Sequence, residues 1–176
     1  MTMTLLNSLL VFLAGHKGQS GYDIRQLFQA TPLGVFSDSP GSIYPSLARL
    51  ERHGLLASSS ETSGRRRRTY ARTREGKKAL DAWLATPIKD EAKLKPGEME
   101  LRFVMIAETL GWGKAKQFLA AAEALYAAKL KELEVFMAGP GTEMSRASRA
   151  AVDLGMRTYR LRIQWCRSVS KQEERT

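Results

Sequence analysis

The sequence is poor in the residues that build metal and redox sites. Among 176 residues there is one cysteine, Cys166, and two histidines, His16 and His53. A single cysteine excludes an intrachain disulfide and favours a cytoplasmic setting. It also leaves no credible set of zinc ligands. Because no Gly-rich phosphate loop or nucleophile motif is present either, we expect no enzyme activity, no catalytic residue, no metal and no cofactor.

Long apolar runs are missing as well. The apolar start LLNSLLVFLAG lacks a basic leader and is interrupted by Asn7 and Ser8, which favours a buried helix over a secretion signal. No stretch approaches the roughly 18 apolar residues that a membrane span needs. The sequence therefore predicts a soluble intracellular protein with no membrane partner.

Positive charge is what the sequence has in excess. Lysine and arginine number 28 against 18 aspartates and glutamates, which gives a formal net charge of +10. This balance is common in proteins that bind phosphate groups, although it also occurs in proteins that are merely basic. Local clustering is therefore more informative than the total, and residues 65–68 are four consecutive arginines.

Apolar spacing in the first third of the chain predicts three helices. Gly15 closes the first, and Ser20 is the expected N-cap of the second, GYDIRQLFQA. The third lies in SPGSIYPSLARLERHGLL, residues 39–56, where Gly54 is a natural terminator. Pro45 leaves its start open, because the helix can begin at Pro40 with a bend or near Ser42 without one.

The next segments read as a hairpin and a further helix. LLASSSE and RRTYAR are expected to be strands on either side of a turn at residues 62–65. Thr73 can cap a fourth helix, REGKKALDAWLAT, which ends at Pro87. Three helices, a hairpin and another helix are the order of a winged helix-turn-helix.

The composition of the chain changes after residue 87. PIKDEAKLKPG is charged and holds two prolines, which is typical of a linker. Helices are then expected near 98–110, 113–138 and 143–171, the last capped by Thr142. The predicted fold class is mainly α: a winged helix-turn-helix DNA-binding domain over residues 1–87, a linker over 88–97 and an all-helical dimerisation domain over 98–176.

The last expected helix carries a heptad-like apolar seam. A second stripe, formed by Leu154, Leu161 and Trp165, widens the apolar face. One short antiparallel helix could hardly cover this face, so we expect a second subunit to do so and the protein to be a homodimer. The residues assigned to this dimerisation seam are Val152, Met156, Tyr159, Ile163 and Cys166.

The third helix and the hairpin together suggest nucleic acid as the partner. With Ile43, Leu47 and Leu50 inward, slim polar groups and one cation are expected to point outward, as the major groove requires. By itself this is also what an ordinary solvated helix face looks like. The arginine run favours nucleic-acid binding over an ordinary solvated face, because clustered guanidinium groups bind phosphates or enter a narrow minor groove. The expected contacts to double-stranded DNA are Ser20, Ser42, Tyr44, Ser46, Arg49, Arg65, Arg66, Arg67 and Arg68.

Three segments, spanning about residues 5–85, resemble the PadR-like transcriptional regulators. LLVFLAGHKGQSGYDI is similar to the first two helices of that family, and SPGSIYPSLARLERHGLL to its recognition helix with a Tyr-Pro pair. GRRRRTYARTREGKKAL resembles its wing and the start of its fourth helix. Two positions depart from the pattern: Arg66 stands where the family often has proline, and Arg72 where it often has leucine. The C-terminal half resembles the longer helical dimerisation domain of one branch of the family.

The resemblance implies a homodimer that binds a partly palindromic operator, usually to repress transcription. Ser42, Tyr44 and Ser46 match its recognition helix, and Arg65, Arg67 and Arg68 match basic wing positions. The alternative is a ligand-sensing or protein-interaction module that binds DNA only non-specifically. The sequence leaves open the operator, activation against repression, and whether a small-molecule effector of unknown identity is a further partner.

Overall fold

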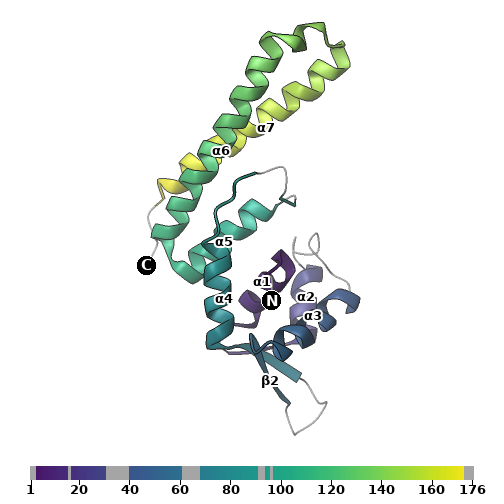
Figure 1. Ribbon diagram of the computed structural model, residues 1–176, viewed down its shortest axis with the longest axis vertical. Coiled ribbons are helices and arrows are strands. Elements are labelled where there is room, and N and C mark those ends of the chain that lie inside the picture. The colour runs from purple at the N-terminus through teal and green to yellow at the C-terminus, as the bar shows by residue number, and fades with distance from the viewer. Residues whose placement is uncertain are drawn as a thin grey trace. The chain divides into compact units, whose positions relative to one another are not determined.

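The computed structural model describes residues 3–15, 17–30, 40–60, 68–90, 94, 95 and 97–172. It divides into two compact units, Met1–Pro87 and Ile88–Thr176. Both are helical, and the first also holds a small antiparallel sheet (Figure 1). None of the helices in the described ranges has the length and apolar character needed to cross a membrane.

The N-terminal unit is a winged helix-turn-helix. Its elements are α1 (Leu5–Ala14), β1 (Gln19–Ser20), α2 (Gly21–Ala30), α3 (Pro40–Arg52), β2 (Leu56–Ser60), β3 (Arg68–Arg72) and α4 (Arg74–Leu84). Side chains from all four helices and from β2 and β3 meet in one core, which includes Leu10, Phe28, Leu47, Leu56, Tyr70 and Leu80. The predicted fold class is therefore confirmed for this unit.

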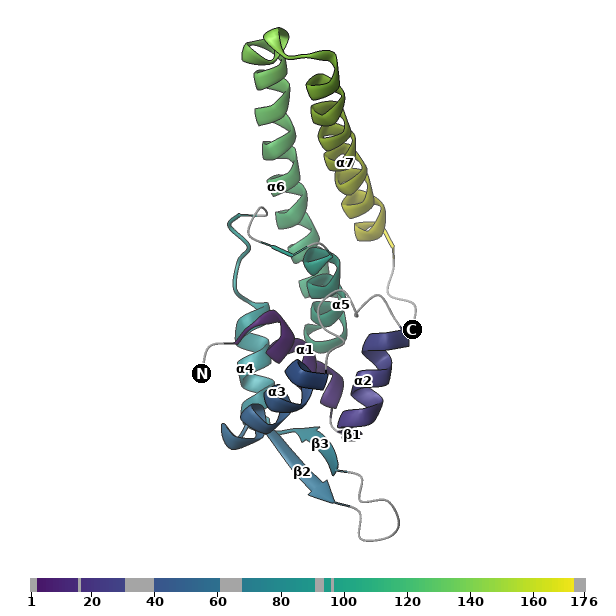
Figure 2. The same cartoon turned by 90° about the vertical axis from the view of Figure 1, so that its right-hand side faces the viewer.

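The sheet has the order β1-β3-β2, and both pairings are antiparallel (Figure 2). The predicted hairpin strands are present, with Ser58 opposite Tyr70 and Ser60 opposite Arg68. The two-residue strand β1 was not predicted. It pairs Gln19 with Tyr70 and Ser20 with Thr69.

Helix ends in this unit follow the predicted chemistry. Gly54 has φ +69°, and the N–H groups of Gly54 and Leu55 donate to the carbonyls of Glu51 and Leu50, which is a Schellman closure of α3. Thr73 caps α4, because its Oγ1 accepts the N–H of Gly76 at 3.0 Å. That hydroxyl also donates to the Gly54 carbonyl at 2.6 Å, so the end of α3 and the start of α4 are joined.

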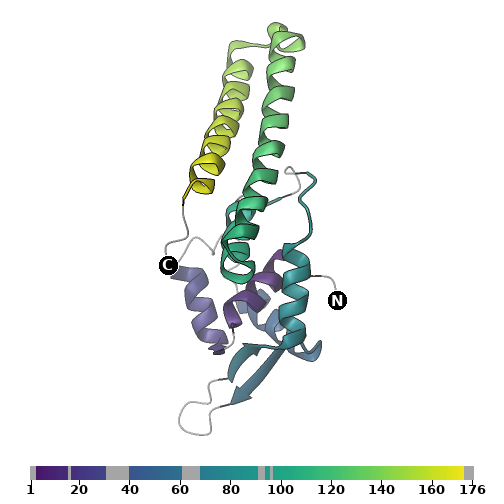
Figure 3. The same cartoon turned by 90° about the vertical axis from the view of Figure 1, so that its left-hand side faces the viewer.

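The C-terminal unit consists of helices only. They are α5 (Glu98–Leu110), α6 (Trp112–Ala138), the short 3-10 helix η3 (Pro140–Glu143) and α7 (Arg146–Ser170). Helices α6 and α7 run side by side in opposite directions (Figure 3). Ion pairs join them, with Arg160 to Glu134 at 2.9 Å and Arg167 to Glu123 at 2.7 Å.

Two expectations for this unit need correction. Thr142 does not cap the last helix: it lies in η3 and its hydroxyl donates back to the Gly139 carbonyl, whereas Ser145 accepts the N–H of Ser148 at 3.2 Å and caps α7. The expected linker is also partly built into this unit, because Ile88 and Leu94 pack against its core.

Candidate nucleic-acid interface

Helix α3 is held on the core by one face and exposes the other. It begins at Pro40, which decides between the two possible starts, and Pro45 lies within it. Ile43, Leu47 and Leu50 are fully buried, as the apolar spacing predicts. Arg49 is exposed and Ser42 is half-buried. The exposed face thus offers one long cation and a short hydroxyl.

Ser46 does not point outward as the sequence analysis expected. Only 3% of it is exposed, and its Oγ accepts a hydrogen bond from Arg49 Nη2 at 3.0 Å. The reason is helical geometry: at about 100° per residue, Ser46 lies only about 40° from Leu50 around the helix axis. Ser46 therefore orients Arg49 from the edge of the core instead of presenting its own hydroxyl.

Tyr44 lies on the opposite flank of α3 and is 40% exposed. Its ring rests on Gly21 at the start of α2, where a Cβ would be 2.7 Å from the tyrosine Cε1. The absence of a side chain at Gly21 makes this packing possible. Tyr44 is therefore supported from α2 while much of its ring faces solvent.

Ser20 is engaged inside the protein. Its Oγ accepts the N–H of Asp23 at 3.1 Å and donates to the Asp23 carboxylate at 2.7 Å, and 3% of the residue is exposed. The predicted N-cap is confirmed. A phosphate at this helix start would meet the negative charge of Asp23, and contact between Ser20 and DNA stays a prediction.

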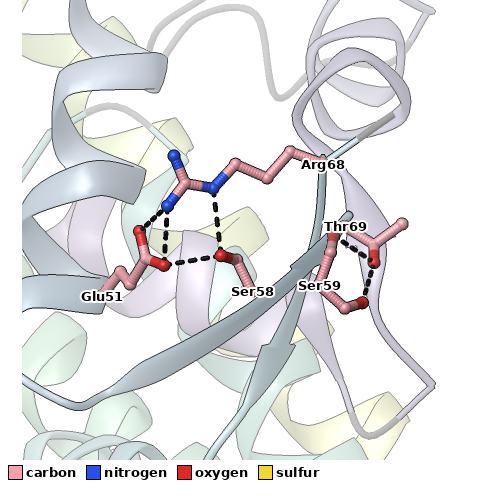
Figure 4. Close-up of polar contacts among 5 residues, drawn as sticks. All are labelled: Glu51, Ser58, Ser59, Arg68 and Thr69. Carbon is pink, nitrogen blue, oxygen red and sulfur yellow. Dashed lines mark hydrogen bonds and ion pairs between the residues drawn. The ribbon is translucent and has the colours of Figure 1, made fainter. Parts of the chain in front are cut away.

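The arginine run is described only at its last member. Arg65, Arg66 and Arg67 lie outside the described residues. Arg68 is the first residue of β3, and its side chain turns back to α3, where Nη2 lies 2.6 Å from Glu51 Oε2 (Figure 4). The hydrogen bonds from Ser58 and then Arg68 lower the pKa of the Glu51 carboxyl, so the pair is ionised at neutral pH.

Glu51 and Ser58 take part in this junction, and the sequence analysis did not identify either. Glu51 is seven residues from Ser58 and 17 from Arg68 along the chain. The pairing of β2 with β3 puts Ser58, Ser60, Arg68 and Tyr70 on one face of the hairpin, since side chains alternate along strands. That alternation was the available signal, but it does not reveal that the face turns towards α3.

The predicted dimerisation seam is mostly occupied within the chain. Ile163 and Cys166 are buried in a core with Met99, Leu119 and Tyr126, and Tyr159 packs against that core. Val152 and Met156 are half-buried. The expectation that Ile163 and Cys166 face a second subunit is therefore wrong, because α6, at 27 residues, is long enough to cover this stripe.

The second stripe of α7 remains uncovered. Leu154 and Leu161 are 67% and 65% exposed, and Val135 on α6 is 65% exposed. Trp165, the third member of that stripe, is half-buried and its ring stands edge-on to Phe103 at 5.5 Å. Exposed apolar side chains mark a surface that binds other proteins when they form a contiguous patch, and Leu154 and Leu161 lie on one face of α7, about 20° apart around its axis.

The N-terminal unit carries a match to a known family. Residues 9–82 match the model of the Transcriptional regulator PadR-like family. Among solved structures, Bacillus subtilis PadR in complex with operator DNA is 22% identical, with a TM-score of 0.46, covering 95% of this chain and 98% of that one. The PadR-like regulator BC1756 from Bacillus cereus is 19% identical, with a TM-score of 0.42 and coverage of 94% and 96%.

The virulence activator AphA from Vibrio cholerae is similar at the same level, with 19% identity, a TM-score of 0.40 and coverage of 95% and 96%. No curated protein matches the chain significantly. The family match falls wholly within the unit Met1–Pro87 and spans α3 and both strands of the hairpin. Through residues 9–82 of this unit, the chain is similar to the Transcriptional regulator PadR-like family.

Proposed function

We propose that this protein is a sequence-specific DNA-binding repressor that acts as a homodimer on a partly palindromic operator. The observation that carries the proposal is the family match over residues 9–82, together with an α3 that exposes Tyr44 and Arg49 from a rigid core. The net charge of +10 supports an anionic partner.

In this proposal α3 enters the major groove. Arg49 is the residue best suited to a guanine edge or a phosphate, because its guanidinium is exposed and is oriented by Ser46. Tyr44 supplies a hydroxyl and a ring edge from the opposite flank, and Ser42 a short donor. Arg65, Arg66 and Arg67 contact flanking phosphates or the minor groove.

A second copy of the chain covers the uncovered stripe of the C-terminal unit. The exposed side chains of Leu154 and Leu161 support this assignment, because an apolar stripe of this kind is stabilised by leaving water. Two copies of the chain carry two recognition helices, and each helix reads one of two related half-sites. Binding over a promoter then blocks transcription, and an effector of unknown identity would act by changing the distance between the helices.

The test is selection of bound sequences from a pool of random duplexes at near-physiological salt. The proposal predicts an enriched motif with two related half-sites. Measurable binding with no enriched motif would reject sequence-specific regulation and favour a ligand-sensing or protein-interaction module with non-specific DNA binding, whose affinity falls equally with salt for all sequences.

A further inference from the structure

A closed set of hydrogen bonds joins the recognition helix to the wing. Arg68 Nη2 donates to Glu51 Oε1 at 2.8 Å and to Oε2 at 2.6 Å, and Arg68 Nε donates to Ser58 Oγ at 3.0 Å. Ser58 Oγ in turn donates to Glu51 Oε1 at 2.6 Å. One residue from α3, one from β2 and one from β3 are thus tied together (Figure 4).

These three residues occupy positions where such a link controls the direction of the wing relative to α3. Glu51 is in the last turn of α3, and Ser58 is in the middle of β2. Arg68 is the first residue of β3, directly after residues 61–67. A bond from Glu51 to Arg68 therefore fixes the strand that leaves the wing tip against the helix that reads DNA.

The same contacts make Arg68 a poor phosphate ligand. Its charge is balanced by the Glu51 carboxylate, and its guanidinium lies 5.6 Å from the centre of the Tyr70 ring. Turning it towards DNA would leave Glu51, which is itself only partly exposed, without its cation, close to a phosphate backbone of the same sign. Screening weakens a partly exposed pair, but the bonds from Nη2 to the Glu51 carboxylate and from Nε to the Ser58 hydroxyl together restrict Arg68 to one orientation.

We propose that Glu51, Ser58 and Arg68 form a clamp that sets the direction of the wing relative to α3 and thereby the selectivity for the operator, and that Arg68 is a positioning residue that does not bind phosphate. This inference rests on the proposed function, because selectivity is defined only for a protein that prefers an operator. It separates Arg68 from Arg65, Arg66 and Arg67, to which the phosphate contacts are assigned.

The experiment measures the affinity of the full chain for the selected operator and for random duplex over a series of salt concentrations. Arg68→Ala is expected to lower the ratio of the two affinities about three- to tenfold, in the lower part of the range for residues coupled in one network. The salt slope is expected to stay unchanged, whereas loss of a phosphate contact would reduce it by about 0.9. A reduced salt slope together with an unchanged ratio of operator to random-duplex affinity would overturn the proposal.

Glu51→Gln provides the complementary variant. It keeps the length of the side chain but releases the Arg68 guanidinium, so binding to random duplex is expected to become tighter and the affinity ratio to fall. The charge-swapped pair Glu51→Arg with Arg68→Glu restores an ion pair between α3 and β3 and is expected to recover most of the ratio. Affinities are calculated for the folded, binding-competent fraction of each variant, so a loss of stability does not lower them. Recovery of the affinity ratio in the charge-swapped variant then shows that the pair acts by positioning the wing.

Lys77→Ala is the matched control. It removes a cation from an equally short ion pair, Lys77 to Asp81 at 2.6 Å, but this pair lies within α4 and links no two elements. The affinity ratio should not change in this variant. If the wild-type protein binds the operator and random duplex with equal affinity, the proposed function itself is rejected. If the wild-type protein prefers the operator and both Arg68→Ala and Glu51→Gln keep the same affinity ratio, only the clamp is rejected.

Discussion

The two units differ in how completely one chain covers its own apolar surface. Among the described residues of the N-terminal unit, the large aliphatic side chains of α3 are fully buried, and the exposed large aromatic groups are Tyr22 and Tyr44, which carry hydroxyls. In the C-terminal unit α6 and α7 bury one stripe against each other and leave Leu154, Leu161 and Val135 about two-thirds in water. The described part of the first unit thus covers its aliphatic side chains within one chain more completely than the second unit does.

Polar contacts join different elements in both units. In the N-terminal unit Thr73 links α4 to the end of α3, and Arg68 links β3 to α3. In the proposed function, such contacts hold the exposed face of α3 in one shape. In the C-terminal unit the pairs between α6 and α7 lie on a long two-helix stem, where they fix the register of the helices but add nothing to the uncovered stripe.

The largest effect is expected from charging the uncovered stripe. Leu154→Glu combined with Leu161→Glu should dissociate the dimer and lower operator affinity by about a hundredfold or more, since the gain from two linked binding units is lost. Sedimentation measures the first effect and a binding titration the second. The fold should survive, because both side chains are already mostly in water.

Ser148→Glu is the control for this pair, because it adds a negative charge at another exposed position of α7, about 120° or more around the helix from both leucines. A doubly charged variant that remains dimeric would place the dimer contact elsewhere and remove the contrast between the units.

Two helical glycines sharpen the contrast in packing. A Cβ on Gly76, in α4, would overlap the backbone carbonyl oxygen of Leu55, whereas a Cβ on Gly113, in α6, meets nothing within 4 Å. Gly76→Ala should cost about 1–3 kcal/mol in the free energy of unfolding, because the backbone must shift. Gly113→Ala should be neutral or stabilising by up to about 1 kcal/mol. Urea unfolding followed by circular dichroism measures both, and equal costs would contradict this packing.

Arg49 tests whether the exposed face of α3 is the DNA-reading surface. Arg49→Ala should weaken operator binding by about tenfold, since a good contact from arginine to a base is worth 1–3 kcal/mol. Arg149→Ala removes an exposed arginine from α7 in the other unit and should leave operator affinity nearly unchanged. If the two variants lose the same affinity, binding depends on total charge and not on α3.

The smallest difference is expected between two helix caps. Thr73 accepts from Gly76 and also donates to the Gly54 carbonyl, whereas the exposed Ser145 caps α7 within its own first turn. Thr73→Ala should cost about 1–2 kcal/mol and Ser145→Ala about half as much or less, within the usual range for caps. Thermal unfolding of the two variants measures the difference, and a larger loss for Ser145→Ala would contradict it.

Local chemistry made much of this fold predictable. Gly54 and Thr73 were identified as helix ends because a left-handed glycine and a capping hydroxyl act on the nearest turn. The hairpin strands were predicted as two short segments around a turn, and α5 followed from apolar spacing. Ser46 was misplaced although its angle around the helix was available, because the face was drawn from apolar residues alone and Ser46 lies at its edge, next to Leu50.

Contacts between distant segments were not predictable. Strand β1 has two residues, too short for any periodicity, and it exists only because Tyr70 and Thr69 pair with it. The seam on α7 correctly indicated a buried face, but apolar spacing cannot tell whether α6 or a second chain covers it. The link between Glu51 and Arg68 depends on how the wing folds back, which the spacing of 17 residues does not encode.

The most direct test of the account is a hydroxyl-radical footprint of the full chain on the selected duplex. The proposal that the N-terminal unit reads DNA and the C-terminal unit pairs two chains predicts two protected segments related by two-fold symmetry. Their centres should be about one helical turn, or a whole number of turns, apart. A single protected segment, or uniform weak protection along the duplex, would contradict the account.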